Sequence, residues 1–373
     1  MHFLAFCYRN VLRRKQRSTL TACSVAIAVA AVVALVGVAT GFKRDFIQFY
    51  EGVGIDILAV GKGKILARPL DESLTDKIKA VEGVAEVVPG LTDQTSFPDY
   101  DLMIVPLNGI EPGTTVFAHM EILSGRTLTS EDGKAVMLGK TVAETLEKTA
   151  GDTVDIDGED FQVVGVYDGF SVIEKGTIVM AIDQLQEHMD REGEVSGFSI
   201  IAMNGTTAEG LQQIIADIEA IDPSRIDAQL AREAVENQPG VKMGIGMAWV
   251  TSSIAMVIGT LGMLNTMLMS LQERVGEIGL LRAVGWTRSR IAKMILGESV
   301  LLSLLGGLVG VLAAFGLVEM LTWLPSAKGF ISGQIDATVV AQGMAIAVGV
   351  GIVGGLLPAL NATRLAPAEA LRQ

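Results

Sequence analysis

The sequence predicts an α-helical membrane protein with four transmembrane helices and an α+β extracytoplasmic domain. Three observations lead to this fold class. The 373-residue chain is 50% hydrophobic, with a mean hydropathy of +0.45. Four windows contain no charged residue and reach the about 20 residues that an apolar helix needs to cross a bilayer: Thr19–Phe42, Met243–Leu271, Ser299–Val318 and Ala337–Thr363. Acidic residues are concentrated between the first two windows.

The charge distribution predicts the orientation of the chain. Residues 43–242 hold 16 basic and 36 acidic side chains, whereas the rest of the chain holds 13 basic and 6 acidic ones. Short basic segments tend to stay in the cytoplasm. We therefore expect both termini on the cytoplasmic side of the membrane, with residues 43–242 outside. The first apolar run exceeds the 7–15 residues of a signal-peptide core, so we expect an uncleaved anchor.

These rules divide the chain into nine consecutive parts. In order they are a basic cytoplasmic helix (1–17), the first span (18–42), the extracytoplasmic domain (43–242), the second span (243–271), a cytoplasmic helix (272–290), the third span (291–319), a short outer loop (320–336), the fourth span (337–361) and a cytoplasmic tail (362–373).

The outer domain mixes helix and strand patterns. Two helices are expected, one after a capping box of Ser73 and Asp76 and one after a similar box of Thr206 and Glu209. Asp157-Gly158 predicts a hairpin turn, and the segment SGFSIIAM predicts a strand. We interpret the acidic residues around this turn as a solvated hairpin, with a cation site as the alternative. The domain has no cysteine, so its core must hold it together without disulfides.

The motifs of common catalytic sites are missing. The sequence has no G-x-x-x-x-G-K-[ST], H-E-x-x-H or G-x-S-x-G pattern, and its three histidines are scattered. We therefore expect no catalytic residue, cofactor or metal in this chain, and no enzymatic activity of its own. The charge of −20 in residues 43–242 argues against a very acidic ligand, and no nucleic-acid partner is expected.

Two features of the spans invite interpretation. Glu298 stands inside the third span, where we favour a position facing the helix bundle or the membrane interface over a proton relay. Three G-x-x-x-G patterns allow helices to approach closely: Gly37–Gly41, Gly306–Gly310 and Gly351–Gly355. We favour packing among the four helices of the chain, with a dimer contact as the alternative.

The segment LQERVGEIGLLRAVGWTRSRI, between the second and third apolar windows, combines charges with many apolar residues. On a helix, one side would carry Val275, Ile278 and Leu281, and another would carry Glu273, Glu277, Leu280 and Val284. Apolar groups on both sides need a covering surface, because burying each Leu or Ile contributes about 1.5–3 kcal/mol. That surface is either another protein or the lipid headgroup layer.

The same segment, followed by ILGESVLLSLLGGLVGVLAA, resembles the coupling loop and third span of the MacB/FtsX-like ABC transporter permeases. The C-terminal LLPALNATRLAPAEALR and the outer stretch GDTVDIDGEDFQVVGVYD resemble the same family. The resemblance implies four spans, a homodimer or heterodimer of permeases, and a separate ATP-binding ABC subunit on the cytoplasmic side. That subunit would bring ATP and Mg²⁺. An extracytoplasmic adaptor and membrane lipids are further expected partners.

The resemblance also assigns a coupling helix that docks on the ATP-binding subunit. Its residues are Glu273, Arg274, Glu277, Leu280, Leu281, Arg282 and Gly285. We expect Glu277 and Arg282 to make charge contacts with the partner, and Leu281 to make the apolar contact.

The function that the resemblance implies is a permease subunit. It would couple ATP hydrolysis to movement of the outer domain, for export or extraction of a lipid, lipoprotein, peptide or drug. The main alternative is an FtsX-type regulatory subunit that controls an extracytoplasmic cell-wall hydrolase without transport. An ATP-independent receptor is a third possibility.

Overall fold

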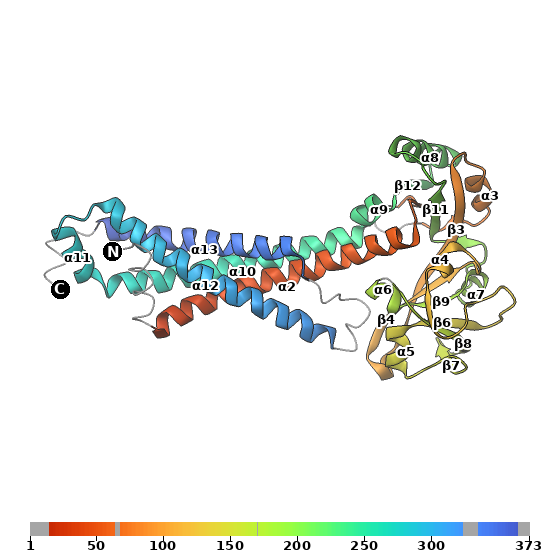
Figure 1. Cartoon of the computed structure of the whole chain (residues 1–373), viewed down its shortest axis with the longest axis horizontal. Coiled ribbons are helices and arrows are strands. Elements are labelled where there is room, and N and C mark those ends of the chain that lie inside the picture. Colours follow the sequence, from red (N-terminus) through yellow and green to blue (C-terminus); the bar gives the residue numbers. More distant parts are fainter. Residues whose placement is uncertain (1–14, 64–67, 170, 324–334, 365–373) are drawn as a thin grey trace. The chain divides into compact units, whose positions relative to one another are not determined.

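The computed structural model describes residues 15–63, 68–169, 171–323 and 335–364 (Figure 1). The predicted N-terminal helix up to residue 14, most of the predicted outer loop and the end of the tail lie outside these residues. The described chain divides into two compact units. The membrane unit comprises residues up to 40, 244–320 and from 335 onward, and the outer unit comprises residues 41–243 with 321–323.

Four described helices are long and apolar enough to cross a membrane, which confirms the predicted fold class (Figure 1). They are α2 (Lys15–Val53), α10 (Pro239–Gln272), α12 (Arg288–Thr322) and α13 (Ala337–Arg364). With 39 residues, α2 is about 58 Å long, which exceeds the about 30 Å thickness of a bilayer core. The charges after Phe42 therefore end the apolar run without ending the helix.

The extension of α2 beyond its apolar run is held within the outer unit. Lys43 forms an ion pair of 2.8 Å with Glu236 of α9 (Ala231–Asn237), the short helix that precedes α10. Phe49 and Tyr50 join an apolar cluster with Ala231. These contacts give residues 43–53 a helical partner, which is why the helix persists where the sequence turns polar.

Glycines set the spacing of helices in the membrane unit. A Cβ atom on Gly306 would lie 2.6 Å from the carbonyl oxygen of Ala22, and one on Gly310 would lie 2.5 Å from that of Ala26. Both contacts join α12 to α2, and both are too short for any side chain. A Cβ atom on Gly351 or Gly355 of α13 would come even closer to the hydroxyl oxygen of Ser303 or Ser299 on α12. The structure thus confirms packing within the chain for these two G-x-x-x-G patterns.

The first and last strands of the outer unit, β1 and β12, belong to the same sheet. Four of its strands are antiparallel and lie in the order β12-β1-β11-β3. Helices α3 and α8 pack on one face of it. The elements follow a βαβ-βαβ order: β1 (Ile57–Gly61), α3 (Leu74–Lys79), β3 (Val84–Phe97), β11 (Gly197–Ala202), α8 (Ala208–Ile221) and β12 (Ile226–Leu230). We call this part the first lobe. The strand predicted from SGFSIIAM is β11.

The chain between β3 and β11 forms a second lobe, inserted into the first. Its strands extend the sheet in the order β3-β4-β9-β6-β8-β5, with β7 on β8. The strands are β4 (Leu102–Ile110), β5 (Glu121–Gly125), β6 (Ala135–Gly139), β7 (Thr153–Ile156), β8 (Glu159–Asp168) and β9 (Ile178–Ala181). The short helices are η1 (Pro98–Tyr100), α4 (Thr115–Ala118), α5 (Lys140–Leu146), α6 (Val172–Lys175) and α7 (Ile182–His188), and β2 (Leu70–Asp71) pairs with β10 (Glu194–Val195).

The predicted hairpin turn is confirmed. Asp157 and Gly158 have φ values of 52° and 90°, and Ile156 pairs with Glu159 across the turn. Two successive left-handed residues give the turn the twist that a two-residue hairpin needs. The Asp155 carboxylate accepts a hydrogen bond of 2.8 Å from the Gly158 amide, so part of the acidic cluster stabilises the turn.

Both predicted capping boxes need correction. Ser73 has helical dihedral angles and makes no side-chain cap, and its amide donates to Asp71 instead. At α8 the cap is Thr207, whose hydroxyl accepts from the Gly210 amide at 3.2 Å, whereas the Thr206 hydroxyl donates to the Met203 carbonyl. Adjacent threonines carry the same capping group, so the sequence could not distinguish which one begins the helix.

The close contact between α12 and α2 predicts the effect of adding a methyl group. Gly310→Ala should destabilise the protein by about 1–3 kcal/mol, because the Cβ atom would overlap the α2 backbone. The measurement is thermal unfolding of the full chain in detergent. Gly316→Ala on the same helix is the control, because no described atom of another element lies within 4 Å of the added Cβ atom. Equal melting temperatures for the two variants would contradict the packing argument.

Candidate functional site on helix α11

The predicted coupling segment forms one short helix between two long ones. α11 (Val275–Ala283) follows α10 after a two-residue break and precedes α12 (Figure 1). Arg274 is its N-cap residue, with φ −112°, and makes no side-chain cap. The helix is therefore shorter than the predicted 272–290, and its first turn is fixed by other contacts.

Gly285 ends α11 through a backbone motif. Its φ is +97°, the left-handed conformation that glycine adopts at low cost. The Trp286 amide donates to the Leu281 carbonyl at 3.0 Å, and the Gly285 amide donates to the Arg282 carbonyl at 3.1 Å. This bond pair is a Schellman motif, which satisfies the last carbonyl groups of a helix. Gly285 thus has a local structural role: it ends α11 and lets the chain change direction before α12 begins.

The inner face of α11 packs on the ends of α12 and α13. Ile278 is only 2% exposed and lies in an apolar cluster with residues of both helices. The buried partners are Ile291, Met294, Ile295, Ala359 and Ala362. Leu281 and Trp286 are partly buried at the margin of the same cluster. Leu281, predicted to contact a partner, therefore already contacts its own chain.

The outer face of α11 presents two acidic and two apolar side chains. Four residues on this face are exposed: Glu273, Glu277, Leu280 and Val284. Their spacings of four, three and four residues place them on the same side of a helix. Leu280 is 58% exposed and Val284 is 76% exposed. The predicted division of the helix into two sides matches this arrangement. We call these four residues the outer face of α11.

Arg274 joins the outer face to the interior of the membrane unit. Its Nε atom lies 3.1 Å from Glu277, and one terminal nitrogen lies 2.9 Å from a carboxylate oxygen of Glu298 on α12. The Arg274 and Glu298 side chains are only 12% and 10% exposed. Glu298 thus faces the helix bundle, as the sequence favoured. Sequence reasoning missed this pair, because its members are 24 residues apart.

Arg282 makes a contact that the sequence did not indicate. Its guanidinium donates to the Thr363 carbonyl at 3.2 Å, near the C-terminal end of α13. A cation there is favoured by the exposed carbonyls and the dipole of the helix. Arg282 therefore stabilises the attachment of α11 to α13, and its role in binding a partner stays a prediction.

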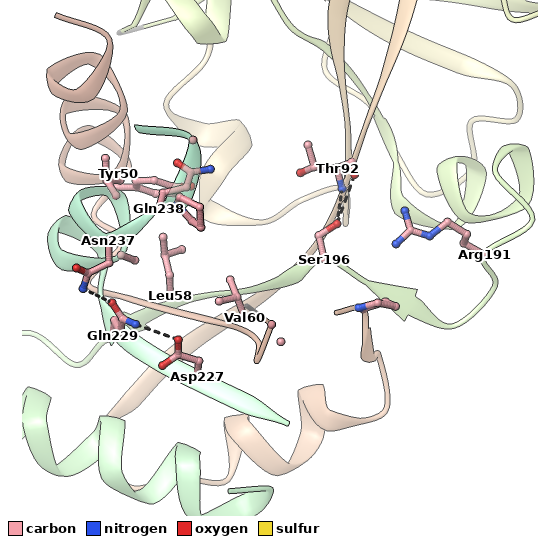
Figure 2. A pocket seen from close by; sticks show the side chains of 17 residues that line it. Tyr50, Leu58, Val60, Thr92, Arg191, Ser196, Asp227, Gln229, Asn237 and Gln238 are labelled. Carbon is pink, nitrogen blue, oxygen red and sulfur yellow. Dashed lines mark hydrogen bonds between the residues drawn. The ribbon is translucent and has the colours of Figure 1, made fainter. Parts of the chain in front are cut away.

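A second candidate site is a cavity of about 670 Å³ in the first lobe, shown in Figure 2. It lies on the sheet face opposite the core that α3 and α8 cover: along β1, Ile57 and Ala59 enter that core, and Leu58 and Val60 line the cavity. Tyr50 lines it from the end of α2.

Part of the polar lining of the cavity is a chain of hydrogen bonds. The Asn237 amide donates to Gln229 at 2.8 Å, and the Gln229 amide donates to Asp227 at 3.0 Å (Figure 2). An apolar floor with a few ordered polar groups suits an amphipathic molecule. Sequence reasoning missed this cavity, because its lining comes from segments far apart in the chain.

Comparison with known proteins covers almost the whole chain. The family model described as MacB-like periplasmic core domain matches residues 18–220. The family model described as FtsX-like permease C-terminal matches residues 249–367. The second match contains all of α11, α12 and α13.

Relatives of two lengths are found. The ABC transporter permease YknZ of Bacillus subtilis is 28% identical, over 97% of this chain and 96% of its own length. The macrolide export ATP-binding/permease protein MacB of Hyphomonas neptunium is 25% identical, over 98% of this chain but only 59% of its own length. The chain thus spans little more than half of that relative.

Two solved structures of extracytoplasmic regions each match about half of the chain. The periplasmic region of MacB from Actinobacillus actinomycetemcomitans has a TM-score of 0.41 and 12% identity, and covers 52% of this chain and 98% of that one. The extracellular domain of YknZ has a TM-score of 0.37 and 18% identity, and covers 47% of this chain and 98% of that one.

The Schellman motif at Gly285 predicts a local effect of substitution. Gly285→Ala should weaken the end of α11 by about 1–2 kcal/mol, because alanine is strained at this positive φ. Faster hydrogen exchange of the amides of residues 281–286 is the expected signal. Gly276→Ala, at an exposed position within α11, is the matched control and should not raise exchange. Unchanged exchange in Gly285→Ala would rule out the capping role.

Proposed function

This chain belongs to the MacB/FtsX-like family of ABC transporter permeases, and from that premise we propose that it couples ATP hydrolysis by a separate ATP-binding subunit to movement of its outer unit. ATP and its Mg²⁺ would bind to that partner. The multi-pass membrane unit would transmit the movement, and the proposed orientation places α11 and both termini in the cytoplasm of a bacterial-type inner membrane.

One observation carries the docking proposal: the outer face of α11 is exposed while its inner face is fixed. Leu280 and Val284 leave apolar surface in water, and covering it would stabilise a complex by about 25 cal/mol per Å². Glu273 and Glu277 on the same face would select a partner surface with basic groups. We therefore move the proposed apolar contact from Leu281 to Leu280 and Val284, and the proposed charge contact from Arg282 to Glu273.

The attachment of α11 supports its use as a transmitting element. Ile278 is buried against α12 and α13, and Arg282 is bonded to the end of α13. A force applied by a docked subunit would therefore reach two spans through side-chain contacts already present. Transport of this kind needs no polar pathway through the spans, because the work would be done on the outer unit.

Pairing of two permeases is part of the proposal. Only 22% of the apolar window of α10 is buried within the chain, compared with 50% for α2. α10 thus offers the most apolar surface to lipids or to a second permease, identical or similar. An extracytoplasmic adaptor on the outer unit would extend the same assembly.

The proposed result of the movement is export or extraction of a lipid, lipoprotein, peptide or drug. The cavity of about 670 Å³ supports a cargo with an apolar part, because its size falls within the about 300–1,000 Å³ of small-molecule sites. The regulatory alternative would use the same coupling helix without cargo. Reconstituted vesicles distinguish transport from regulation. ATP-dependent release of an amphipathic probe would support transport. ATP-dependent activation of a cell-wall hydrolase without release of the probe would support regulation.

Docking on the outer face predicts selective loss of binding. Leu280→Ser combined with Val284→Ser should weaken binding of the ATP-binding subunit that copurifies with the wild-type chain by about 100-fold. Two lost apolar contacts of about 1.4 kcal/mol each give this factor. The measurement is equilibrium binding to the full chain in nanodiscs.

Met103→Ser provides the matched control for this experiment. Met103 is 67% exposed, but it lies on β4 in the outer unit, so its loss should leave binding unchanged. Wild-type affinity in the double variant would place the docking surface elsewhere. Failure of any ATP-binding subunit to copurify with the wild-type chain would reject the proposed function itself.

A further inference from the structure

Glu298 is the buried ionisable residue of α12 that the proposed docking surface leaves unexplained. It is the eleventh residue of that helix, about 15 Å from its start. The residue is only 7% exposed. A carboxylate so placed is costly unless it has a partner, and buried charges of this kind usually serve a function.

Arg274 supplies that partner from the base of α11. One terminal nitrogen of its guanidinium lies 2.9 Å and 3.3 Å from the two carboxylate oxygens of Glu298. The guanidinium is always charged, and its orientation is fixed by a second contact, from Nε to the Glu277 carboxylate at 3.1 Å. The pair therefore attaches the junction between α10 and α11 to one position along the length of α12.

We propose that the Arg274–Glu298 ion pair fixes the position of the coupling helix on α12, so that a load on α11 moves α12 with it. Both are positioning residues, since they act through α11. The inference rests on the proposed function for its purpose, although the pair and its effect on α11 can be measured without any partner.

The connection of α11 to α12 explains why a directional contact is needed. Continuous backbone joins the far end of α11 to α12, where the Thr287 hydroxyl accepts from the Arg290 amide at 3.3 Å. The apolar contacts of Ile278 have no preferred direction, and the hydrogen bond of Arg282 attaches α11 to α13 and not to α12. The ion pair ties the near end as well. With both ends held, α11 and α12 behave as one rigid element.

Glu277 links this rigid element to the docking surface. It is exposed on the outer face of α11, and its carboxylate lies 3.1 Å from Nε of the same Arg274. A basic group of a docked subunit would compete with Arg274 for Glu277. Arg274 would then have Glu298 as its remaining carboxylate partner, which would strengthen the attachment of α11 to α12 when a partner is bound.

The first test uses the full chain alone, in nanodiscs. Spin labels replace Gly276 on α11 and Lys293 on α12, both exposed, in a Cys7→Ser/Cys23→Ser background. The unmodified pair should give one narrow distribution of label distances. Glu298→Gln should broaden it, and the exchanged pair Arg274→Glu/Glu298→Arg should narrow it again. A wild-type width in Glu298→Gln would overturn the inference.

A second variant separates positioning from stability. Arg274→Met/Glu298→Met replaces the buried pair by apolar groups, a change that often leaves stability intact. We expect an unchanged melting temperature together with a broadened distance distribution. If this variant keeps the narrow distribution, the ion pair does not set the position of α11, and the inference fails.

The last test adds the ATP-binding subunit that copurifies with the wild-type chain. At a saturating concentration of that subunit, Arg274→Met/Glu298→Met should lose about tenfold of the ATPase stimulation, a typical size for lost coupling. Full stimulation would overturn the inference. If no such subunit copurifies, the proposed function fails, and the label distances alone decide whether the pair positions α11.

Discussion

The cost of an unpaired peptide group in hydrocarbon shapes this chain more than any other constraint. Each such group costs several kcal/mol, so a lipid-exposed segment must satisfy its hydrogen bonds internally. The four long helices meet this demand, and irregular backbone in the described membrane unit is confined to their ends. With the backbone satisfied, helix association depends on close packing and on a few polar contacts, because lipid offers no hydrophobic driving force between helices.

Under that constraint α12 makes close contacts with α2, α13 and α11. Gly306 and Gly310 bring it against α2, and its serines lie against the glycines of α13. Its first turns receive the inner face of α11, and Glu298 receives Arg274. The glycine contacts prevent α12 from moving closer to α2 and α13. The ion pair prevents the start of α11 from sliding along α12. The same helix thus combines a steric role toward α2 and α13 with an electrostatic role toward α11.

The sequence allowed the large features to be predicted because they depend on short-range patterns. Uninterrupted apolar runs located the four long helices, and Asp157-Gly158 located a turn, since only a few residue types tolerate its dihedral angles. Helix periodicity also separated the two sides of α11. It could not reveal which side faced inward, because both sides carry apolar residues. The resemblance assigns Leu281 and Arg282 to a partner surface, whereas in the structure both contact their own chain.

Features that depend on tertiary contacts escaped the sequence. The helical extension of α2 relies on Lys43 meeting Glu236, which lies almost two hundred residues later. Similarly, the lining of the cavity combines the end of α2 with strands β1 and β12. The insertion of the second lobe left no signal either, because strands and helices alternate in both lobes. Comparison with relatives identified the family.

The insertion of the second lobe has a consequence for how such chains diversify. Gly90 of β3 and Gly197 of β11 are paired neighbours in the sheet, so the lobe leaves and rejoins the first lobe at adjacent points. A short hairpin there would close the smaller sheet and leave its two helices in place. A change in the length or surface of the second lobe therefore leaves the connection between the first lobe and the spans unaltered.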